Sequence, residues 1–430
     1  MGKRIFIIIG FLVIAGGLAW LLWLVFFRPA VPPVRPALPI EKEVVPPRLP
    51  VAREAWEKMT YEERVRLGLP PTEWTEEVVP PEVAPPVSPV EVVVPEIDEV
   101  AEGRKTWVNP VSAEPALAAT LSIDGKNSFY YDKDHGKFYK IDSLGNKELL
   151  TDQSFYNVEE VNWAPTKDRA VLTYPDGFKI MYDFDRKKQY TLPKNWEDFS
   201  WDPSGARIAF KSTSRYPENN WLAIARPDGS QAQPIEHMGD NADKVVVSWS
   251  PNNQVIAFSA TGAPRGAWEQ EILLIGQYGE NFKSLVVDGR GFEPEWSPAG
   301  DKIAYSVYSV ESGYQPRLYI VNAQGADIGT GKINLNLATW AHKCTFNKSG
   351  ATLYCGVPRD LPEGVGLIPE LATRIRDDFY KIDVATGEIS FLAEGAMGGY
   401  DVEKIYLSDD ESLLYFVDKN MGRLRYIRLK

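Results

Sequence analysis

The sequence predicts an all-β fold, a β-propeller built from four-stranded blades. A ten-residue pattern recurs as WAPTKDRAVL from Trp163, WDPSGARIAF from Trp201, WSPNNQVIAF from Trp249 and WSPAGDKIAY from Trp296. Weaker copies begin at Leu121, Phe346 and Leu407, and the seven starting points are 42, 38, 48, 47, 50 and 61 residues apart. A period of about 40 to 50 residues is typical of propellers and other repeat arrays. We expect seven blades, with six as the alternative if one weak copy is decorative.

Each copy has the chemistry of a hairpin between two strands. Pro203 lies two residues after its anchor and presets φ for a tight turn, and Gly205 tolerates positive φ. The run that follows, Ile208 to Phe210, is apolar on both faces, as expected for a strand between stacked sheets. A third strand and a further turn come next, which gives four strands per repeat and therefore a propeller blade.

The last copy ends as LRYIRLK and is one strand short. An unclosed ring would leave two exposed sheet edges. We therefore predict that KTWVNPV, Lys105 to Val111, supplies the missing outer strand and closes the ring. The predicted propeller domain spans 105–430.

An apolar segment near the N-terminus predicts membrane attachment. Ile5 to Phe27 is a run of 23 residues without a charge, and as a helix it would be roughly 34 Å long, enough to cross a bilayer. The run is longer than the apolar part of a cleaved signal peptide. We expect a single-pass anchor over 1–27, with Lys3 and Arg4 favouring a cytoplasmic N-terminus and an extracytoplasmic propeller.

A proline-rich segment follows this anchor. Between Arg28 and Val100 lie 16 of the 33 prolines, which oppose both helix and sheet. The composition predicts a stalk over 28–104. One short amphipathic helix is expected at 53–67, where Trp56, Met59 and Val65 follow a helical period, and the alternatives for it are a partner-docking segment or a solvated helix.

The W-x-P-x-G-x-x-I-A-F pattern resembles the TolB-like β-propeller repeat, which also occurs in the propeller domains of dipeptidyl peptidase and prolyl oligopeptidase relatives. The resemblance covers about 105–430, and the copies at Leu121, Phe346 and Leu407 depart from it by losing Trp and Pro. It implies a propeller fold and a habit of binding protein partners through one rim. It does not imply a single function.

Motifs of catalysis are missing from the sequence. The peptidase relatives use a G-x-S-x-G nucleophile turn, and the sequence contains none. The three histidines, His135, His237 and His342, fall in different repeats without metal-ligand spacing. We therefore predict no catalytic residue, no metal site and no cofactor. The net charge of -12 argues against nucleic acid as a partner, because binding to phosphates needs concentrated Lys and Arg.

The two cysteines flank the sixth hairpin, CTFNKSGATLYC. If Phe346 lies opposite Leu353, then Cys344 lies opposite Cys355, since antiparallel partners keep a constant index sum. A cross-strand disulfide and a pair of buried thiols are both compatible with this spacing.

A partner-binding rim is predicted where the loops between second and third strands are longest. These loops grow across the third to sixth repeats, whereas the turns on the other rim stay short. Loop elaboration on one side of a rigid scaffold usually houses binding. The predicted partner-binding residues are the aromatic ones on these loops: Tyr216, Trp221, Trp268, Tyr308 and Tyr314.

Acidic residues precede the anchors, where the innermost strands enter from the same rim. The alternatives are a negatively charged channel mouth that attracts a cationic peptide or metal ions, and a hydrated, screened funnel. The acidic residues are Glu159, Glu160, Glu197, Asp198, Asp243, Glu293, Asp401 and Glu403.

These observations favour a non-enzymatic protein-binding or scaffold module at the cell envelope, with a protein or peptide partner. The competing interpretation is a hydrolase or lyase that uses carboxylates at the channel mouth on an envelope glycan or peptide.

Overall fold

The computed structural model describes residues 56–66 and 97–430, apart from residues 123, 143–144, 264 and 397. The chain divides into two compact units, Met1–Glu91 and Val92–Lys430. The predicted membrane anchor at 1–27 and most of the predicted stalk lie outside the described residues. None of the helices within the described ranges is long and apolar enough to cross a membrane.

The first unit contains the helix α3 (Tyr61–Arg66), which lies within the segment predicted to be helical. Thr60 and Glu63 form a capping box: the Thr60 N–H donates to Glu63 Oε2 at 2.9 Å, and the Glu63 N–H donates to Thr60 Oγ1 at 3.4 Å. The Arg64 guanidinium stacks over the Trp56 ring, 3.8 Å from its centroid, whereas Val65 is exposed. Trp56 and Val65 therefore do not share a buried face.

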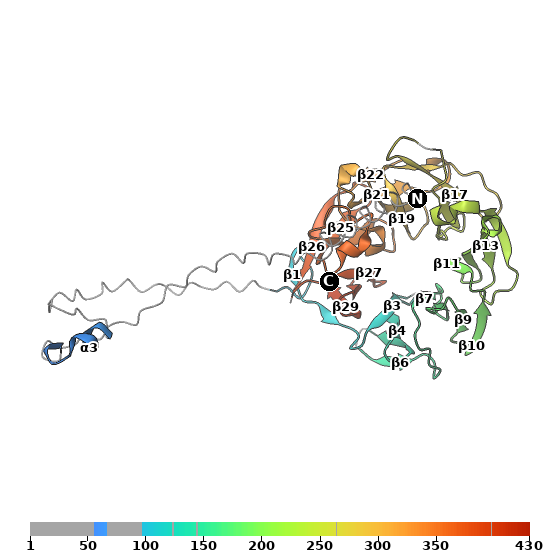
Figure 1. Ribbon diagram of the computed structural model, residues 1–430. Coiled ribbons are helices and arrows are strands. Elements are labelled where there is room, and N and C mark those ends of the chain that lie inside the picture. The colour runs from blue at the N-terminus through green and yellow to red at the C-terminus, as the bar shows by residue number, and fades with distance from the viewer. Residues whose placement is uncertain (1–55, 67–96, 123, 143–144, 264, 397) are drawn as a thin grey trace, which may run out of the picture. The chain divides into compact units, whose positions relative to one another are not determined.

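The second unit is a seven-bladed β-propeller, with the blades arranged around a common axis (Figure 1). Apart from the outermost strands of blades 6 and 7, antiparallel strands follow one another in chain order from the axis outward within each blade. The first three blades are β3 (Ala116–Leu121), β4 (Asn127–Asp132), β5 (Lys137–Asp142) and β6 (Lys147–Leu149); β7 (Glu160–Trp163), β8 (Arg169–Thr173), β9 (Lys179–Asp183) and β10 (Lys188–Leu192); and β11 (Trp196–Trp201), β12 (Ile208–Ser212), β13 (Trp221–Ala225) and β14 (Gln233–His237).

Blades 4 and 5 are β15 (Val245–Val247), β16 (Ala257–Ser259), β17 (Gln270–Ile275) and β18 (Leu285–Val287); and β19 (Arg290–Trp296), β20 (Lys302–Tyr308), β21 (Pro316–Asn322) and β22 (Ile333–Asn334). Blades 6 and 7 contain β23 (Cys344–Phe346), β24 (Thr352–Pro358), β25 (Asp377–Asp383) and β26 (Ile389–Gly395); and β27 (Val402–Leu407), β28 (Leu413–Asp418) and β29 (Arg423–Arg428). Short 3-10 helices lie in the connections: η1 (Pro217–Asn219), η2 (Gly239–Lys244), η3 (Val310–Ser312), η4 (Gly325–Asp327), η5 (Ala341–Lys343) and η6 (Pro369–Ala372).

The repeated pattern marks the end of the innermost strand in each blade. Six of the seven predicted anchors are the last residue of that strand, and Trp249 follows β15 by two residues. The turn after the anchor needs a residue with positive φ, which Gly205 supplies at +69°. Lys167 and Glu411 depart from the Gly or Asn rule, yet they adopt the same left-handed conformation, with φ of +63° and +55°.

The hydrophobic core lies between neighbouring blades. Ala209, Ala257 and Ala304, in the second strands of their blades, are fully buried and let adjacent sheets approach closely. Phe258 of blade 4 and Tyr305 of blade 5 belong to one cluster of buried side chains that spans two blades. Stacking of blades therefore stabilises the ring.

The ring is closed by residues from the start of the second unit. Residues of β2 (Asn109–Pro110) pair antiparallel with β29, with Asn109 opposite Tyr426, so the predicted outer strand of blade 7 is confirmed at these two residues, whereas Lys105 and Thr106 pair in blade 6 instead. The strand β1 (Arg104–Thr106) adds a fifth, parallel strand to blade 6 beside β26, which the sequence did not predict. Isolated parallel bridges pair Asp98 with Thr106 of β1 and Val100 with Arg428 of β29, so residues before Lys105 also contribute to the seam. The N-terminal segment thus joins both blades at the seam.

Candidate functional site

The connections between second and third strands of blades 4, 5 and 6 pack against one another. The Gly364 N–H donates to the Gly313 carbonyl at 2.9 Å, and the Gly366 N–H donates to the Tyr314 carbonyl at 2.7 Å. These bonds join the 359–376 connection of blade 6 to the η3 region of blade 5. Gly366 is required at this contact, because a Cβ there would lie 2.6 Å from atoms of the Tyr308 ring.

An aromatic contact joins blade 4 to the same assembly. The Trp268 and Tyr314 rings meet edge to face, with their centroids 5.6 Å apart. Hydrogen bonds and rings therefore hold three connections together on one side of the propeller. We call this braced surface, formed by residues 260–269, 309–315 and 359–376, the loop rim.

Aliphatic side chains on the loop rim are exposed to solvent. Val310 is 50% exposed, Leu367 55%, Ile368 53% and Leu371 49%. Val310 and Leu371 lie on the 3-10 helices η3 and η6, and Leu367 and Ile368 lie between these helices in sequence. We call these four residues the apolar rim patch. Exposed apolar groups on braced loops are typical of interaction sites.

The five aromatic residues predicted for partner binding fall into two groups. Trp268, Tyr308 and Tyr314 are half-buried in the loop rim, where they support its loops. Tyr216 is exposed and Trp221 packs edge to face on His237, both in blade 3. No contact between described residues brings these two blade-3 side chains to the other three.

A second group of candidate side chains converges near the propeller axis from the inner strands and the connections beside them. Electrostatic interactions link them although they come from blades 2, 5, 6 and 7. We call them the axial cluster: Lys167, Glu293, Glu295, His342, Glu403, Lys404 and Tyr406.

The two glutamates of β19 in the axial cluster differ in their environments. His342 contacts Glu293 through both its backbone N–H, at 2.8 Å from Oε1, and its Nδ1, at 2.6 Å. Burial opposes ionisation of Glu293, but these contacts with His342 outweigh burial and lower its pKa. Burial raises the pKa of Glu295, and the nearby Lys404 only partly offsets it. The pKa values of these two glutamates of one strand are therefore shifted in opposite directions.

The cations of the axial cluster differ in the same way. Interaction with Tyr406 is the largest influence on Lys404 and raises its pKa; partial loss of hydration near the axis opposes the rise although the residue is exposed, and Glu295 adds to it. Burial lowers the pKa of Lys167 to about 8, and the charge of Lys404 lowers it further. The axis therefore holds an ammonium that is fully charged at neutral pH and one that loses its proton in mildly alkaline solution.

The predicted acidic residues do not all meet in this cluster. Glu293 and Glu403 belong to it. Asp198 pairs with Lys211, and Asp198 also contributes, after burial, to the raised pKa of Glu160. Glu159 lies beside Glu160, whereas Glu197 and Asp243 are exposed and make no ion pair with the described residues. Cations are thus interleaved with the predicted carboxylates.

Asp401 belongs to a buried triad between blades 6 and 7. Lys343 Nζ lies 2.9 Å from Asp377 Oδ2 and 3.5 Å from Asp401 Oδ1, and all three residues are less than 7% exposed. The Val402 N–H donates to Asp377 at 2.6 Å, and the Arg374 N–H donates to Asp401 at 2.9 Å. The triad therefore ties the end of the 359–376 connection to blade 7, which gives the loop rim a rigid base.

The two cysteines occupy the predicted register. Cys344 lies opposite Cys355 in the pairing of β23 with β24, and the sulfur atoms are at bonding distance, 2.12 Å. Among the described residues, no group of three or more His, Cys, Asp or Glu side chains is placed to hold a metal ion.

Comparisons with known proteins relate the chain to propellers of diverse roles. No family model matches the sequence, and no curated protein matches it. Among solved structures, an oligogalacturonate lyase in complex with manganese is similar with a TM-score of 0.50 at 12% identity, over 74% of this chain and 90% of that one. The β-propeller domain of Cps50 (Swd1) from Myceliophteria thermophila has a TM-score of 0.50 at 12% identity, over 75% of this chain and 100% of that one.

A third similar structure is the oligogalacturonate lyase of Vibrio parahaemolyticus, with a TM-score of 0.50 at 11% identity, over 75% of this chain and 91% of that one. At these identities the likeness shows the fold alone. The resemblance to the repeat family is thus supported at the level of a seven-bladed propeller, and the neighbours include a lyase as well as a propeller domain with no enzyme in its description.

Several functional residues were missed by the sequence analysis. Glu295 could have been found, because residues two apart on a strand share a face and Glu293 was already a candidate. Lys404 directly follows Glu403 in β27, so the rule for residues two apart does not find it. Leu367, Ile368 and Leu371 had no periodic signal, since the 359–376 connection is not a regular element.

Proposed function

We propose that the propeller is a non-enzymatic protein-binding module that docks a partner on its loop rim. The apolar rim patch carries this proposal, because four half-exposed aliphatic side chains stand on loops that are braced from beneath. A preorganised surface loses little conformational entropy on binding, and central apolar anchors supply most of the affinity of protein interfaces.

The charges around the patch suggest the partner's chemistry. Glu311, Glu363 and Glu370 lie on the same loops and are exposed, and so are Arg265, Arg374 and Arg376. A partner that presents apolar anchors flanked by charges of both signs would match this surface, with the charges steering its approach. We therefore expect a protein with an apolar docking face bordered by charges of both signs.

We further propose that the module belongs to the TolB-like propellers and works at a membrane, outside the cytoplasm. The uncharged run from Ile5 to Phe27 supports a single-pass anchor. The pairing of Cys344 with Cys355 fits an oxidising compartment. The Trp-containing repeats support the family relationship.

Site-specific crosslinking tests the proposed docking surface. A photoreactive phenylalanine analogue would replace Leu367 in the full-length chain, and irradiation of intact cells should crosslink it to one defined protein. The matched control is the same replacement at Leu149, an exposed residue on the outer strand of blade 1. Identical products at both positions, or none at Leu367, would contradict the proposal.

A hydrolase or lyase of an envelope glycan or peptide is the second candidate, favoured by one observation in the axial cluster. Glu295, with a raised pKa, lies near Glu293, with a lowered pKa, and such divergence is how paired carboxylates divide the roles of acid and base. The test is turnover of envelope polymers by the full-length chain and by its Glu295→Gln variant. If the full-length chain turns over such a polymer and the Glu295→Gln substitution abolishes this turnover, the enzymatic interpretation would replace the binding proposal.

A further inference from the structure

Blade 4 has an incomplete outer strand. Its outermost strand, β18, pairs with β17 only from Gln270 to Ile272, opposite Val287 to Leu285. The remaining half of β17, Leu273 to Ile275, pairs on its inner side with β16 and faces the 276–284 connection on its outer side. The blade thus ends in a partly unpaired strand edge, in which Leu274 is 6% exposed.

The main chain of Leu274 is directed to this edge. The Ile275 carbonyl accepts a hydrogen bond from the Ile256 N–H, on the inner side of the strand. Because alternate residues of a strand bond to opposite neighbours, Leu274 directs its N–H and carbonyl outward. No hydrogen bond from the part of the chain that the structure describes reaches either group.

Blade 5 shows that a short outer strand does not by itself leave such an edge. Its strand β22 is only two residues long. The Leu318 N–H nevertheless donates to the Leu337 carbonyl at 3.1 Å, and the Leu318 carbonyl accepts from the Leu335 N–H at 3.0 Å. Residues that follow β22 therefore satisfy the edge in blade 5, whereas the connection in blade 4 leaves it open.

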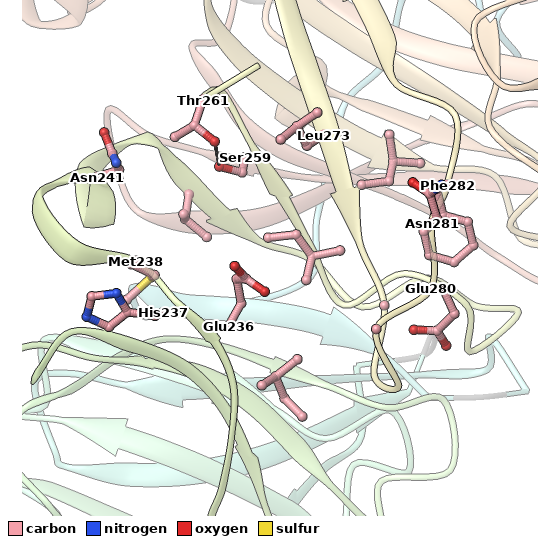
Figure 2. A pocket seen from close by; sticks show the side chains of 16 residues that line it. Glu236, His237, Met238, Asn241, Ser259, Thr261, Leu273, Glu280, Asn281 and Phe282 are labelled. Atoms are coloured by element: carbon pink, nitrogen blue, oxygen red, sulfur yellow. Dashed lines mark hydrogen bonds between the residues drawn. The ribbon is translucent and has the colours of Figure 1, made fainter. Parts of the chain in front are cut away.

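A groove of 360 Å³ lies beside this edge, between β14 of blade 3 and the 276–284 connection (Figure 2). Its apolar lining includes Ile235, Met238 and Phe282, together with Leu273, which is 39% exposed. The groove therefore combines free main-chain groups with apolar walls, the two features by which a sheet edge accepts an added strand.

The acidic side chains of the groove indicate which kind of segment would bind there. Its lining contains the carboxylates of Glu236 and Glu280 and neither Lys nor Arg. Figure 2 shows Glu236 projecting between the residues of β14 and those of the connection. The Glu236 side chain is exposed and forms no hydrogen bond or ion pair with the described residues, and Glu280 Oε2 accepts only the Tyr278 N–H, at 2.7 Å.

We propose that this groove binds an extended, basic segment of a partner protein, which adds a strand to β17 and completes blade 4. The segment's main chain would hydrogen-bond with Leu274, its apolar side chains would cover Leu273, and Lys or Arg would face Glu236 and Glu280. The site lies at the outer edge of blades 3 and 4 and is separate from the apolar rim patch, so the propeller carries two docking surfaces.

Two short capped peptides test the proposal on the full-length chain. Acetyl-(Lys-Val)4-amide should bind, as followed by fluorescence polarisation, and should slow hydrogen exchange in the segment 270–276. Acetyl-(Glu-Val)4-amide should bind at least about tenfold more weakly, since its charges oppose both carboxylates. Equal affinity for both peptides, or unchanged exchange in 270–276, would overturn the proposal.

Variants separate the charges from the fold. The double substitution Glu236→Lys with Glu280→Lys should weaken binding of the lysine peptide about tenfold, while Glu388→Lys, an exposed residue of blade 6, should leave it unchanged. Equal temperatures of thermal unfolding for the original chain, the double variant and the control variant would confirm that the fold is retained. Binding that is unaffected by the double substitution would contradict the role of the carboxylates.

Main-chain recognition has its own test. A strand bonds to one neighbour through alternate residues, so N-methylation of the odd or of the even amides of the lysine peptide should abolish binding in only one of the two series. The proposal would be refuted if neither methylated series lost binding. It would also be refuted if the segment 270–276 became protected at higher protein concentration without peptide, because that result would indicate a second copy of the chain as the occupant. Leu367→Ser should not affect peptide binding, so the two docking surfaces succeed or fail independently.

Discussion

Trp268 of blade 4 and Tyr314 of blade 5 meet edge to face, 5.6 Å between ring centroids, and so connect two blades through their loops rather than through their sheets. Contacts of this type are worth about 0.5 to 1.5 kcal/mol beyond the area they bury. The loop rim is therefore a coupled surface, in which a change in one loop is transmitted to the next.

A double-mutant cycle measures this coupling. Trp268→Ala and Tyr314→Ala should each lower the free energy of unfolding, and the double variant should lose about 0.5 to 1.5 kcal/mol less than the sum of the two. Urea unfolding provides the values. Trp268→Ala combined with Tyr216→Ala, in blade 3, serves as the control and should be additive; a zero coupling for Trp268 and Tyr314 would show that the rings touch without stabilising the rim.

Lys343 is expected to be essential for stability at the base of the loop rim. Lys343→Met would leave Asp377 and Asp401 buried without their cation, which costs about 3 to 5 kcal/mol for a buried pair. Chemical unfolding measures the loss. Lys348→Met removes a largely exposed ion pair with Asp409 and should change stability by no more than about 0.5 kcal/mol.

Asp377 should make stability depend on pH in an unusual direction. Burial raises its pKa to about 6, although Lys343 opposes the rise, whereas in the unfolded chain the value returns to about 4. The folded state therefore binds more protons between these values, and this residue's contribution to stability is present at pH 4 and is lost as the pH rises to 6. The slope from this residue is at most about 1.4 kcal/mol per pH unit.

The variant Asp377→Asn isolates that contribution. It retains an acceptor for the Val402 N–H but cannot titrate. The difference in unfolding free energy between the original chain and the variant should therefore change between pH 4 and 6 and be constant above pH 7. A constant difference throughout would mean that the pKa of Asp377 is the same in the folded and the unfolded chain.

Lys167 should titrate within an accessible range. Burial is the main reason that its pKa is lowered to about 8, and Lys404 is the second. Lys404→Met should therefore raise the pKa of Lys167 but leave it below the usual value of about 10.4. NMR titration of reductively ¹³C-methylated lysines follows the shift, with Lys381→Met, on the exposed outer part of blade 6, as the control that leaves Lys167 unchanged.

The seam of the ring depends on one buried hydroxyl. Ser112 is 2% exposed; its Oγ donates to the Glu114 carbonyl at 2.9 Å and accepts from the Leu424 N–H at 3.0 Å. Ser112→Ala should cost about 1 to 3 kcal/mol, because the Leu424 N–H is left unpaired. Hydrogen exchange should accelerate in β29, whereas Ser230→Ala, in an exposed turn, should change neither quantity.

The fold could be predicted because its signals are local and repeated. A tryptophan at Trp201, a turn glycine at Gly205 and the apolar run from Ile208 each specify one part of a hairpin, and the repeat period then specifies the array. The closing strand could be predicted as well, since Asn109 and Pro110 complete a blade that lacks its fourth strand. The fifth strand of blade 6 had no such signal, because the blade was already complete.

The candidate site was harder to predict because it depends on contacts between distant repeats. Glu293 meets His342 through a connection of another blade, and no spacing in the sequence indicates that the two are neighbours. Gly366 fits beneath Tyr308 only once the 359–376 connection has folded back on blade 5. The main chain of Leu274 lacks a strand partner on its outer side, and the absence of a partner leaves no pattern in the sequence from which it could be predicted.

Closure of the ring also sets an order of events in biosynthesis. The Leu424 N–H and Ser112 Oγ that meet at the seam are 312 residues apart in the chain, so at about 5 to 20 residues per second the ribosome needs roughly 15 to 60 s to make the second partner after the first. Throughout that interval the segment that will become β2 must wait without a partner. Pro110, which cannot donate a main-chain hydrogen bond, protects the nascent chain from pairing there with the wrong strand.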